Sequence, residues 1–184
     1  TDVSSDIIPL CVLGSYSAGK STLINALIGM EILPSGDEPV TARIFQIKRS
    51  KDRDRAMVQF SCGNRRFLLR FDLDGLMENK ELMGEPLYDK IAAKVADSMP
   101  GMASHMNSAL KVLNSYHADE DDRTISDLIR IEVPFSDTDP WPHDREFVIF
   151  DTPGSNSDSN ADHARVLKQA MEGFSNGLPI FVAE

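Results

Sequence analysis

An eight-residue stretch near the start of the chain has the residue types and the spacing of a phosphate-binding loop. It reads Gly14-Ser-Tyr-Ser-Ala-Gly19-Lys20-Ser21, which matches the pattern G-x-x-x-x-G-K-[ST]. Glycine permits the backbone angles that turn successive N–H groups toward an anion, and a helix starting at the loop adds its own free N–H groups. Lys20 is predicted to reach the β- and γ-phosphates, and the Ser21 hydroxyl to ligate Mg²⁺. The stretch therefore predicts binding of a nucleoside triphosphate.

The segments on either side of this loop are those that must position it. Residues 7–13 form an apolar run that predicts a buried strand. Residues 22–28 carry apolar side chains at three- and four-residue spacings, which predicts a helix packing one face on a sheet. Gly29 fits the end of that helix. Strand, loop and helix together are the context that the motif requires.

A threonine beyond the loop fits a first nucleotide-sensing switch. Thr41 lies 21 positions after Lys20 and just before an alternating run, residues 42–47, that predicts a strand. Ras-like and dynamin-like GTPases have their first switch at this place. There the threonine hydroxyl ligates Mg²⁺, and its backbone holds the attacking water. The spacing from Lys20, more than the threonine itself, makes Thr41 a candidate.

A second switch is predicted where the apolar run 146–150 ends in Asp151-Thr-Pro-Gly154. This D-x-x-G pattern after a buried strand is typical of GTPases. Asp151 is predicted to hold Mg²⁺ through water, and the Gly154 N–H to contact the γ-phosphate. Hydrolysis breaks that contact when such loops relax.

Composition narrows the class of protein. The chain has 184 residues, with 19 basic and 29 acidic side chains and a formal charge of −10. This acidic balance argues against nucleic acid as a partner and against this segment itself lying on anionic lipid. Cys11 and Cys62 lie in strand-like runs and are interpreted as buried free thiols in a reducing compartment. With no apolar run of membrane-spanning length and no signal peptide, a cytoplasmic location is expected.

The remaining pattern predicts a doubly wound α/β fold with a mostly parallel sheet, that of a P-loop NTPase with a Ras-like core. Residues 1–184 are assigned to one domain, which carries a helical insertion over about 72–125. A hairpin is expected before the insertion, turning at Gly63-Asn64, and a strand after it at 128–133. The charged turn 48–55 and the acidic loop 118–123 are both interpreted as solvated.

Five segments together make the chain resemble the GTPase domain of the dynamin superfamily, and bacterial dynamin-like proteins most of all. They are Gly14-Ser-Tyr-Ser-Ala-Gly-Lys-Ser-Thr22, Asn25-Ala-Leu-Ile-Gly29, Leu33-Pro-Ser-Gly36, Pro39-Val-Thr41 and Asp151-Thr-Pro-Gly154. The resemblance implies GTP hydrolysis, a homodimer across the nucleotide face, and coupling to membrane binding or remodelling through parts outside this chain. It also implies nucleotide contacts along the whole loop, from Gly14, Ser15, Tyr16, Ser17, Ala18, Gly19, Lys20, Ser21 and Thr22.

The resemblance further implies catalytic residues. Lys20, Thr41 and Ser17 are the candidates, with Ser17 holding a monovalent cation, K⁺ or Na⁺, that places positive charge on the transition state. Two positions depart from familiar patterns. Well-known dynamins have glutamine where this chain has Tyr16, and Ser155 stands where Ras has its catalytic glutamine. The backbone of Thr41 is therefore expected to place the water.

Base specificity is not carried by residues of this chain. Guanine recognition resembles N/T-K-x-D, and the nearest stretch, Asn79-Lys80-Glu81-Leu82, has leucine where aspartate is required. The C-terminal part of the domain, with that loop, is expected to lie outside this chain. Two alternatives therefore stay open beside GTP hydrolysis. One is a nucleotide-dependent switch or scaffold with little turnover, and the other is an ATP-binding P-loop protein.

Overall fold

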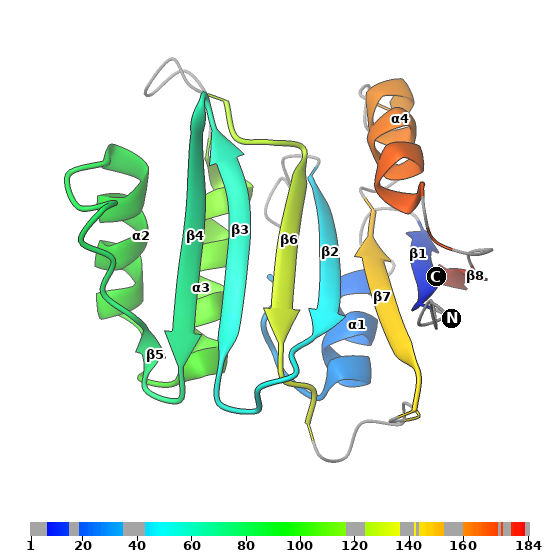
Figure 1. The fold of residues 1–184 in the computed structure, drawn as a ribbon, viewed down its shortest axis with the longest axis horizontal. Coiled ribbons are helices and arrows are strands. Elements are labelled where there is room, and N and C mark those ends of the chain that lie inside the picture. The colour runs from blue at the N-terminus through cyan, green and yellow to red at the C-terminus, as the bar shows by residue number, and fades with distance from the viewer. Residues whose placement is uncertain are drawn as a thin grey trace, which may run out of the picture.

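One eight-stranded sheet, in the order β5-β4-β3-β6-β2-β7-β1-β8, organises the computed structural model (Figure 1). The structure describes residues 7–14, 19–34, 43–116, 124–136, 142, 144–152, 160–172, 174 and 178–182. The elements in chain order are β1 (Ile7–Gly14), α1 (Lys20–Ile28), β2 (Ile44–Arg49), β3 (Ala56–Cys62), β4 (Arg65–Asp72), β5 (Gly75–Leu76), α2 (Pro86–Ala96), α3 (Met102–Ser115), β6 (Leu128–Val133), β7 (Glu146–Asp151), α4 (Asn160–Met171) and β8 (Leu178–Val182).

The predicted α/β class is confirmed, with one difference in strand direction. The strand β1 runs parallel to β7 and β8, and β2 runs parallel to β6, but the other four pairs are antiparallel. The sheet is therefore mixed and not mostly parallel. The tight turn at Gly63, with φ 57°, forces β3 and β4 into an antiparallel hairpin, as predicted. The pattern of apolar residues in β2 and β6 does not encode strand direction, because parallel and antiparallel strands share the same two-residue period.

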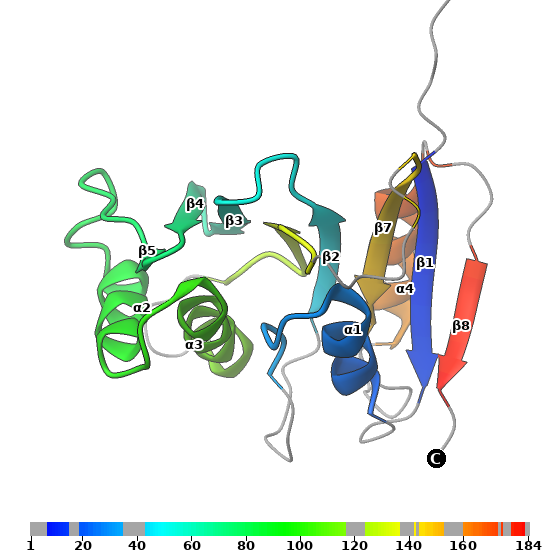
Figure 2. The same ribbon diagram turned by 90° about the horizontal axis from the view of Figure 1, so that it is seen from below.

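Helices cover both faces of the sheet, so the doubly wound arrangement is confirmed (Figure 2). The helices α1, α2 and α3 pack on one face around the larger apolar cluster, which includes Ile24, Ile91 and Leu110. The helix α4 packs on the other face, where it covers Val148 and Phe150 with its apolar side chains. Both cysteines are buried and free, as predicted, since they point into these layers.

The helical segment predicted between the hairpin and β6 is present as α2 and α3. The helix α2 begins at Pro86, where the missing N–H of proline leaves no bond unmade. The helix α3 follows Gly101 and packs against α2 and the β4–β5 hairpin. The acidic loop 118–123 lies outside the described residues. Among the described helices, none is both long and apolar enough to cross a membrane.

Candidate functional site

The two ends of the predicted phosphate-binding loop are placed by β1 and α1. The strand β1 ends at Gly14 and α1 begins at Lys20. Gly19 precedes the helix with φ 80°, in the left-handed region that side chains avoid, while open space surrounds the place of a Cβ. The backbone angle, and not crowding, therefore requires glycine at this position. The middle of the loop, residues 15–18, lies outside the described part of the chain.

The lysine of the motif points back across the loop. Lys20 Nζ donates a hydrogen bond to the Gly14 carbonyl oxygen at 3.1 Å. Lys20 is the first residue of α1, and Gly14 is the last residue of β1. This hydrogen bond therefore joins the two ends of the loop. Lys20 is half-buried, so its charge is only partly screened by water. This places one strong cation where the loop would hold phosphate groups.

The two predicted Mg²⁺ ligands of the described chain meet at this point. The Ser21 hydroxyl donates to Asp151 Oδ2 at 3.5 Å, although 130 positions separate the two residues. Parallel pairing of β1 with β7 sets Asp151 opposite Val12, near the end of β1. A hydroxyl and a carboxylate are both hard oxygen donors, and Mg²⁺ is commonly bound through one or two such protein groups together with substrate phosphates and water. The donor set therefore fits Mg²⁺.

Burial changes the acid–base behaviour of Asp151, whose side chain is 7% exposed. Desolvation raises the pKa of the carboxyl from 3.8 to about 6, against the opposing effects of the Lys20 charge and the Ser21 hydrogen bond. The carboxylate is thus charged at neutral pH, but at an energetic cost that nearby positive charge reduces. A carboxylate held in this way is suited to bind a divalent cation.

A threonine that the sequence did not single out anchors the start of the predicted second switch. The Thr152 hydroxyl donates to the Val12 carbonyl oxygen at 2.9 Å, which fastens the start of the D-x-x-G segment to β1. The pattern D-x-x-G leaves this position open, so the sequence carries no signal for the contact. Gly154, the predicted γ-phosphate contact, lies outside the described residues.

A buried amide holds the segment that follows α1, on the way to the predicted first switch. Asn25 Nδ2 donates to the Leu33 carbonyl oxygen at 3.0 Å. Its Oδ1 accepts from the backbone N–H groups of Ile32 and Leu33 at 3.2 and 2.9 Å. Since Ile32 and Leu33 are themselves buried, one side chain satisfies three backbone groups that water does not reach. Asn25 therefore fixes the chain as it leaves α1.

Replacing Asn25 by alanine is expected to lower the free energy of unfolding by about 2–4 kcal/mol, because it removes the side-chain partner of the buried Leu33 N–H and C=O groups. The Ile32 N–H keeps a hydrogen bond to the Met30 carbonyl oxygen at 3.1 Å. Urea titration followed by circular dichroism measures the change. The matched control is Asn107→Ala, which removes a single amide hydrogen bond, at 3.3 Å, to the Ile32 carbonyl oxygen of the same segment. Equal losses in the two variants would contradict this reading of Asn25.

An arginine beside the predicted first switch is the second feature that the sequence missed. Arg43 donates to the carbonyl oxygens of Leu113, Tyr116 and Ile125 at 3.0, 3.2 and 3.0 Å. Burial lowers the pKa of its guanidinium, which the charge of Asp127 opposes. Two of these oxygens lie at the C-terminal end of α3, where carbonyl groups lack helical partners and attract cations. Arg43 thus fastens the start of β2 to α3, while Thr41 lies outside the described residues.

The described geometry defines the class of protein. A parallel strand leads into a glycine-flanked loop, the loop lysine reaches back across it, and an acidic side chain from the neighbouring strand lies beside the loop serine. This is the arrangement of a P-loop nucleotide-binding protein of the α/β class.

Comparison with known proteins identifies the family. A model of the dynamin family matches residues 10–178, which is nearly the whole chain. The chain therefore belongs to the dynamin family, and the fold is that of its GTPase domain.

Individual similar proteins overlap it only in part. Clamp-binding protein CrfC of Escherichia coli (strain K12) is 38% identical over 52 residues, covering 28% of this chain and 7% of CrfC. GTPase Era of Nocardioides sp. (strain ATCC BAA-499 / JS614) is 33% identical over 85 residues, covering 46% of this chain and 24% of Era. Two solved chains of an oligomerised bacterial dynamin pair, described as a mechanism for long-range sensing and tethering of membranes, are 16% identical, with TM-scores of 0.49 and 0.44. Each match covers 95% of this chain and 20% of the other chain. The chain thus spans less than a quarter of the length of each of these proteins.

Proposed function

We propose that this chain hydrolyses GTP to GDP and phosphate in a Mg²⁺-dependent reaction, and that turnover is coupled to self-association and to membrane binding or remodelling. The observation that supports hydrolysis most directly is the meeting of Ser21 with Asp151 at 3.5 Å beside the loop that Lys20 spans. Two oxygen donors for a divalent cation and one lysine cation lie together at the end of β1. Membership of the dynamin family supports the same activity.

Different residues bind different parts of the triphosphate and its metal ion. Backbone N–H groups of Gly14 to Thr22 surround the phosphates, and the Lys20 ammonium binds the β- and γ-phosphate oxygens. Ser21, Thr41 and Asp151 hold the metal site. Mg²⁺, when bound there, neutralises negative charge on the phosphate oxygens. The Gly154 N–H contacts the γ-phosphate and links the second switch to the state of the nucleotide.

Hydrolysis requires a placed water and positive charge on the transition state. The backbone of Thr41 orients the water, since neither Tyr16 nor Ser155 offers the glutamine used elsewhere. The water oxygen attacks the γ-phosphorus, the bond to the β-phosphate oxygen breaks, and GDP leaves with the electron pair. Lys20 stabilises the charge that develops, and Ser17 would hold a monovalent cation, K⁺ or Na⁺, that would add positive charge there.

The proposed domain extent, self-association and membrane contact follow from membership of the dynamin family. Residues 1–184 form the GTPase domain with its insertion at about 72–125, and two copies associate across the nucleotide face. Parts of the protein outside these residues contact the membrane, so the protein is cytoplasmic and peripheral at a membrane.

Initial rates of phosphate release test the activity. We expect turnover of GTP to exceed that of ATP, and to rise with K⁺ or Na⁺ and with lipid vesicles. Cation-independent turnover of ATP would overturn the proposal. Tight GTP binding with no turnover under any of these conditions would favour a nucleotide-dependent switch or scaffold.

The variant Thr41→Ala tests the first switch. It keeps the backbone but removes the hydroxyl, so we expect the GTP hydrolysis rate to fall by roughly 10- to 100-fold, as when a metal site loses a supporting contact. Affinity for GDP should stay nearly unchanged. Fluorescent GDP titration supplies the control measurement, and normal turnover by the variant would show that Thr41 is not a switch residue.

A further inference from the structure

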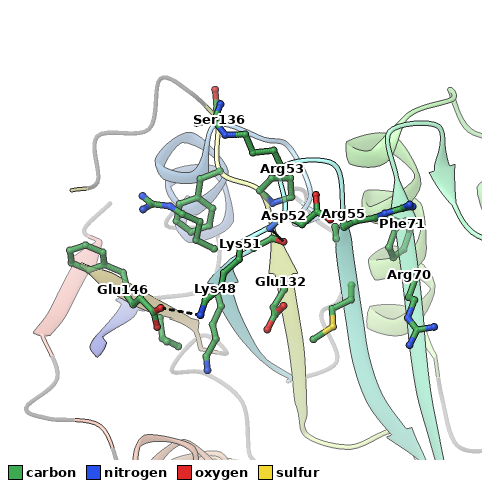
Figure 3. Close-up of a pocket in the computed structure, with 18 of the residues that line it drawn as sticks. Lys48, Lys51, Asp52, Arg53, Arg55, Arg70, Phe71, Glu132, Ser136 and Glu146 are labelled. Carbon is green, nitrogen blue, oxygen red and sulfur yellow. Dashed lines mark hydrogen bonds and ion pairs between the residues drawn. The ribbon is translucent and has the colours of Figure 1, made fainter. Parts of the chain in front are cut away.

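A pocket of about 900 Å³ lies at the end of the sheet opposite the phosphate-binding loop (Figure 3). It is lined where β2, β4 and β6 end and where β3 and β7 begin. Glu146, on its rim, pairs with Ile7 at the start of β1, whereas the loop follows Gly14 at the end of β1. At about 3.3 Å per strand residue, roughly 20 Å separates this pocket from the loop. It is therefore a separate place on the molecule.

Positive charge is concentrated around this pocket in a chain that is acidic overall. Its lining includes five arginines, Arg49, Arg53, Arg55, Arg70 and Arg145. Two lysines, Lys48 and Lys51, bring the basic residues to seven of the 19 in the chain. Only three acidic residues, Asp52, Glu132 and Glu146, line the same pocket, which leaves a formal surplus of four positive charges. The chain as a whole carries −10.

Long-range strand pairing completes this cluster from one charged run and two distant arginines. The stretch 48–55, interpreted from the sequence as a solvated turn, brings five of the seven basic residues. The β3–β4 register sets Arg70 opposite Met57, and Met57 in turn lies opposite Glu132 of β6. Arg145 arrives with the start of β7. The sequence shows residues 48–55 as a charged run, but the pocket forms only where strand pairing adds Arg70 and Arg145 to that run.

The acidic neighbours hold these cations weakly. Lys51 Nζ lies 3.9 Å from Glu146 Oε1, with the two side chains 94% and 51% exposed (Figure 3). Arg55 lies 3.7 Å from the Asp72 carboxylate, and its side chain is 52% exposed. Exposed ion pairs at such distances contribute little and exchange readily for a better anion. The side chains of Lys51 and Arg55 can therefore turn toward a ligand.

Part of the wall is apolar. Met57, Met77, Phe135 and Phe147 are half-buried in the lining. The Arg49 guanidinium lies 5.1 Å from the centre of the Phe135 ring, and an Arg55 nitrogen lies 3.3 Å from the Met77 sulfur. Arginine side chains held against such groups keep a fixed orientation, which favours planar, two-pronged recognition of an anion.

From these observations we propose that the pocket binds a small phosphate-bearing ligand, at a second anion site separate from the phosphate-binding loop. Arginine is the side chain that best matches the geometry of phosphate, and the volume is that of a small-molecule site. A recess of this size suits a small multivalent anion better than a flat protein surface. Two sources share this chemistry, a soluble phosphorylated molecule and the phosphomonoester headgroup of a lipid.

The test uses inorganic pyrophosphate as the probe, added to the full chain in excess GDP. Amide chemical shifts are followed by NMR, and the dissociation constant by calorimetry. We expect shifts at residues 51–55 and 145–148. The double variant Arg53→Glu/Arg145→Glu should weaken binding at least about tenfold, because it removes two contact cations. The matched control, Arg66→Glu/Arg130→Glu, changes the same total charge at two exposed arginines outside this pocket and should leave affinity within roughly threefold, given screening by salt.

Further binding measurements distinguish a lipid headgroup from a soluble phosphorylated ligand, and both from an acidic peptide. Binding to phosphatidylcholine vesicles only when they contain phosphatidic acid, lost in the Arg53→Glu/Arg145→Glu variant, would identify a lipid headgroup. Binding of pyrophosphate without such vesicle binding would identify a soluble ligand. The proposal is overturned if pyrophosphate shifts only the phosphate-binding loop, if both double variants weaken binding equally, or if a polyglutamate peptide binds the pocket more tightly than pyrophosphate.

Discussion

Replacing Asp151 by asparagine is expected to stabilise the nucleotide-free protein while abolishing Mg²⁺-dependent hydrolysis. The buried carboxylate has its pKa raised from 3.8 to about 6 by desolvation, so the folded protein at neutral pH carries a charge that the unfolded chain holds more comfortably. A difference of about 2 pKa units corresponds to about 3 kcal/mol at most. Asparagine keeps the size of the side chain and can still pair with Ser21, but it has no charge to bury. The same loss of charge removes the metal's carboxylate, so turnover should fall at least roughly 100-fold.

The contribution of Asp151 to the free energy of unfolding depends on pH. The folded state, with the raised pKa, binds the Asp151 proton more tightly than the unfolded state does. Wild-type stability arising from this group is therefore fully present below about pH 4 and is lost as pH rises through about 6. The advantage of Asp151→Asn over wild type should be near zero at pH 4, grow up to pH 6 and then level off. Urea unfolding across this range measures the difference between the two proteins, which cancels other titrating groups.

Two controls accompany the Asp151→Asn experiment. Asp97→Asn alters an exposed carboxylate at the end of α2 and should show no such pH-dependent gain. Adding Mg²⁺ with GTP should stabilise the wild type but not Asp151→Asn, because ligand binding stabilises only the protein that binds it. A variant less stable than wild type at pH 8 would show that the carboxylate pairs favourably in the folded state, contrary to the burial argument.

Replacing Lys20 by alanine is expected to lower GTP turnover by roughly 100- to 1,000-fold, the effect typical of losing one group that stabilises transition-state charge. Affinity for GTP should fall more than affinity for GDP, because the lysine is predicted to reach the γ-phosphate. The fold should survive, since the side chain's hydrogen bond to the half-buried Gly14 carbonyl is worth only about 1 kcal/mol.

Single-turnover phosphate release and fluorescent nucleotide titration measure the two parts of this prediction. Lys20→Met keeps the aliphatic stem and separates loss of charge from loss of packing, while Lys94→Ala removes an exposed helical lysine and should change neither quantity. If Lys20→Ala bound GTP and GDP with unchanged affinities, the loop would not be the nucleotide site.

Short sequence patterns predicted the elements that are determined by neighbouring residues in the chain. The strand and helix on either side of the predicted phosphate-binding loop and the hairpin turn at Gly63 are each encoded within a few consecutive residues, and the structure confirms these elements. The loop itself stays a prediction, because residues 15–18 lie outside the described chain. The sequence assigns Ser21 and Asp151 separately to Mg²⁺, and the structure brings their side chains to 3.5 Å from each other.

Contacts made across the fold could not be predicted. Arg43 is half-buried against carbonyl groups 70 and 82 positions away, which no local pattern around it indicates. Thr152 is tied to Val12 only because β7 pairs with β1. The basic pocket likewise needs five strands to be in register before Arg70 and Arg145 approach residues 48–55. Each of these features depends on strand order, which residue patterns leave open.

The strand order also has a consequence for how the chain assembles. The hairpin of β3 and β4 joins Cys62 to Arg65, whereas β1 must find partners such as Glu146 and Leu178, more than 130 positions along the chain. Contacts between distant positions carry the larger loop-closure cost and therefore form late in folding. The pairing of β1 with β7, the two strands that place Lys20 and Asp151, is therefore expected late in folding. We expect intermediates containing the hairpin and α2–α3 to precede any nucleotide-binding form, so that recovery of nucleotide binding marks the last step of refolding.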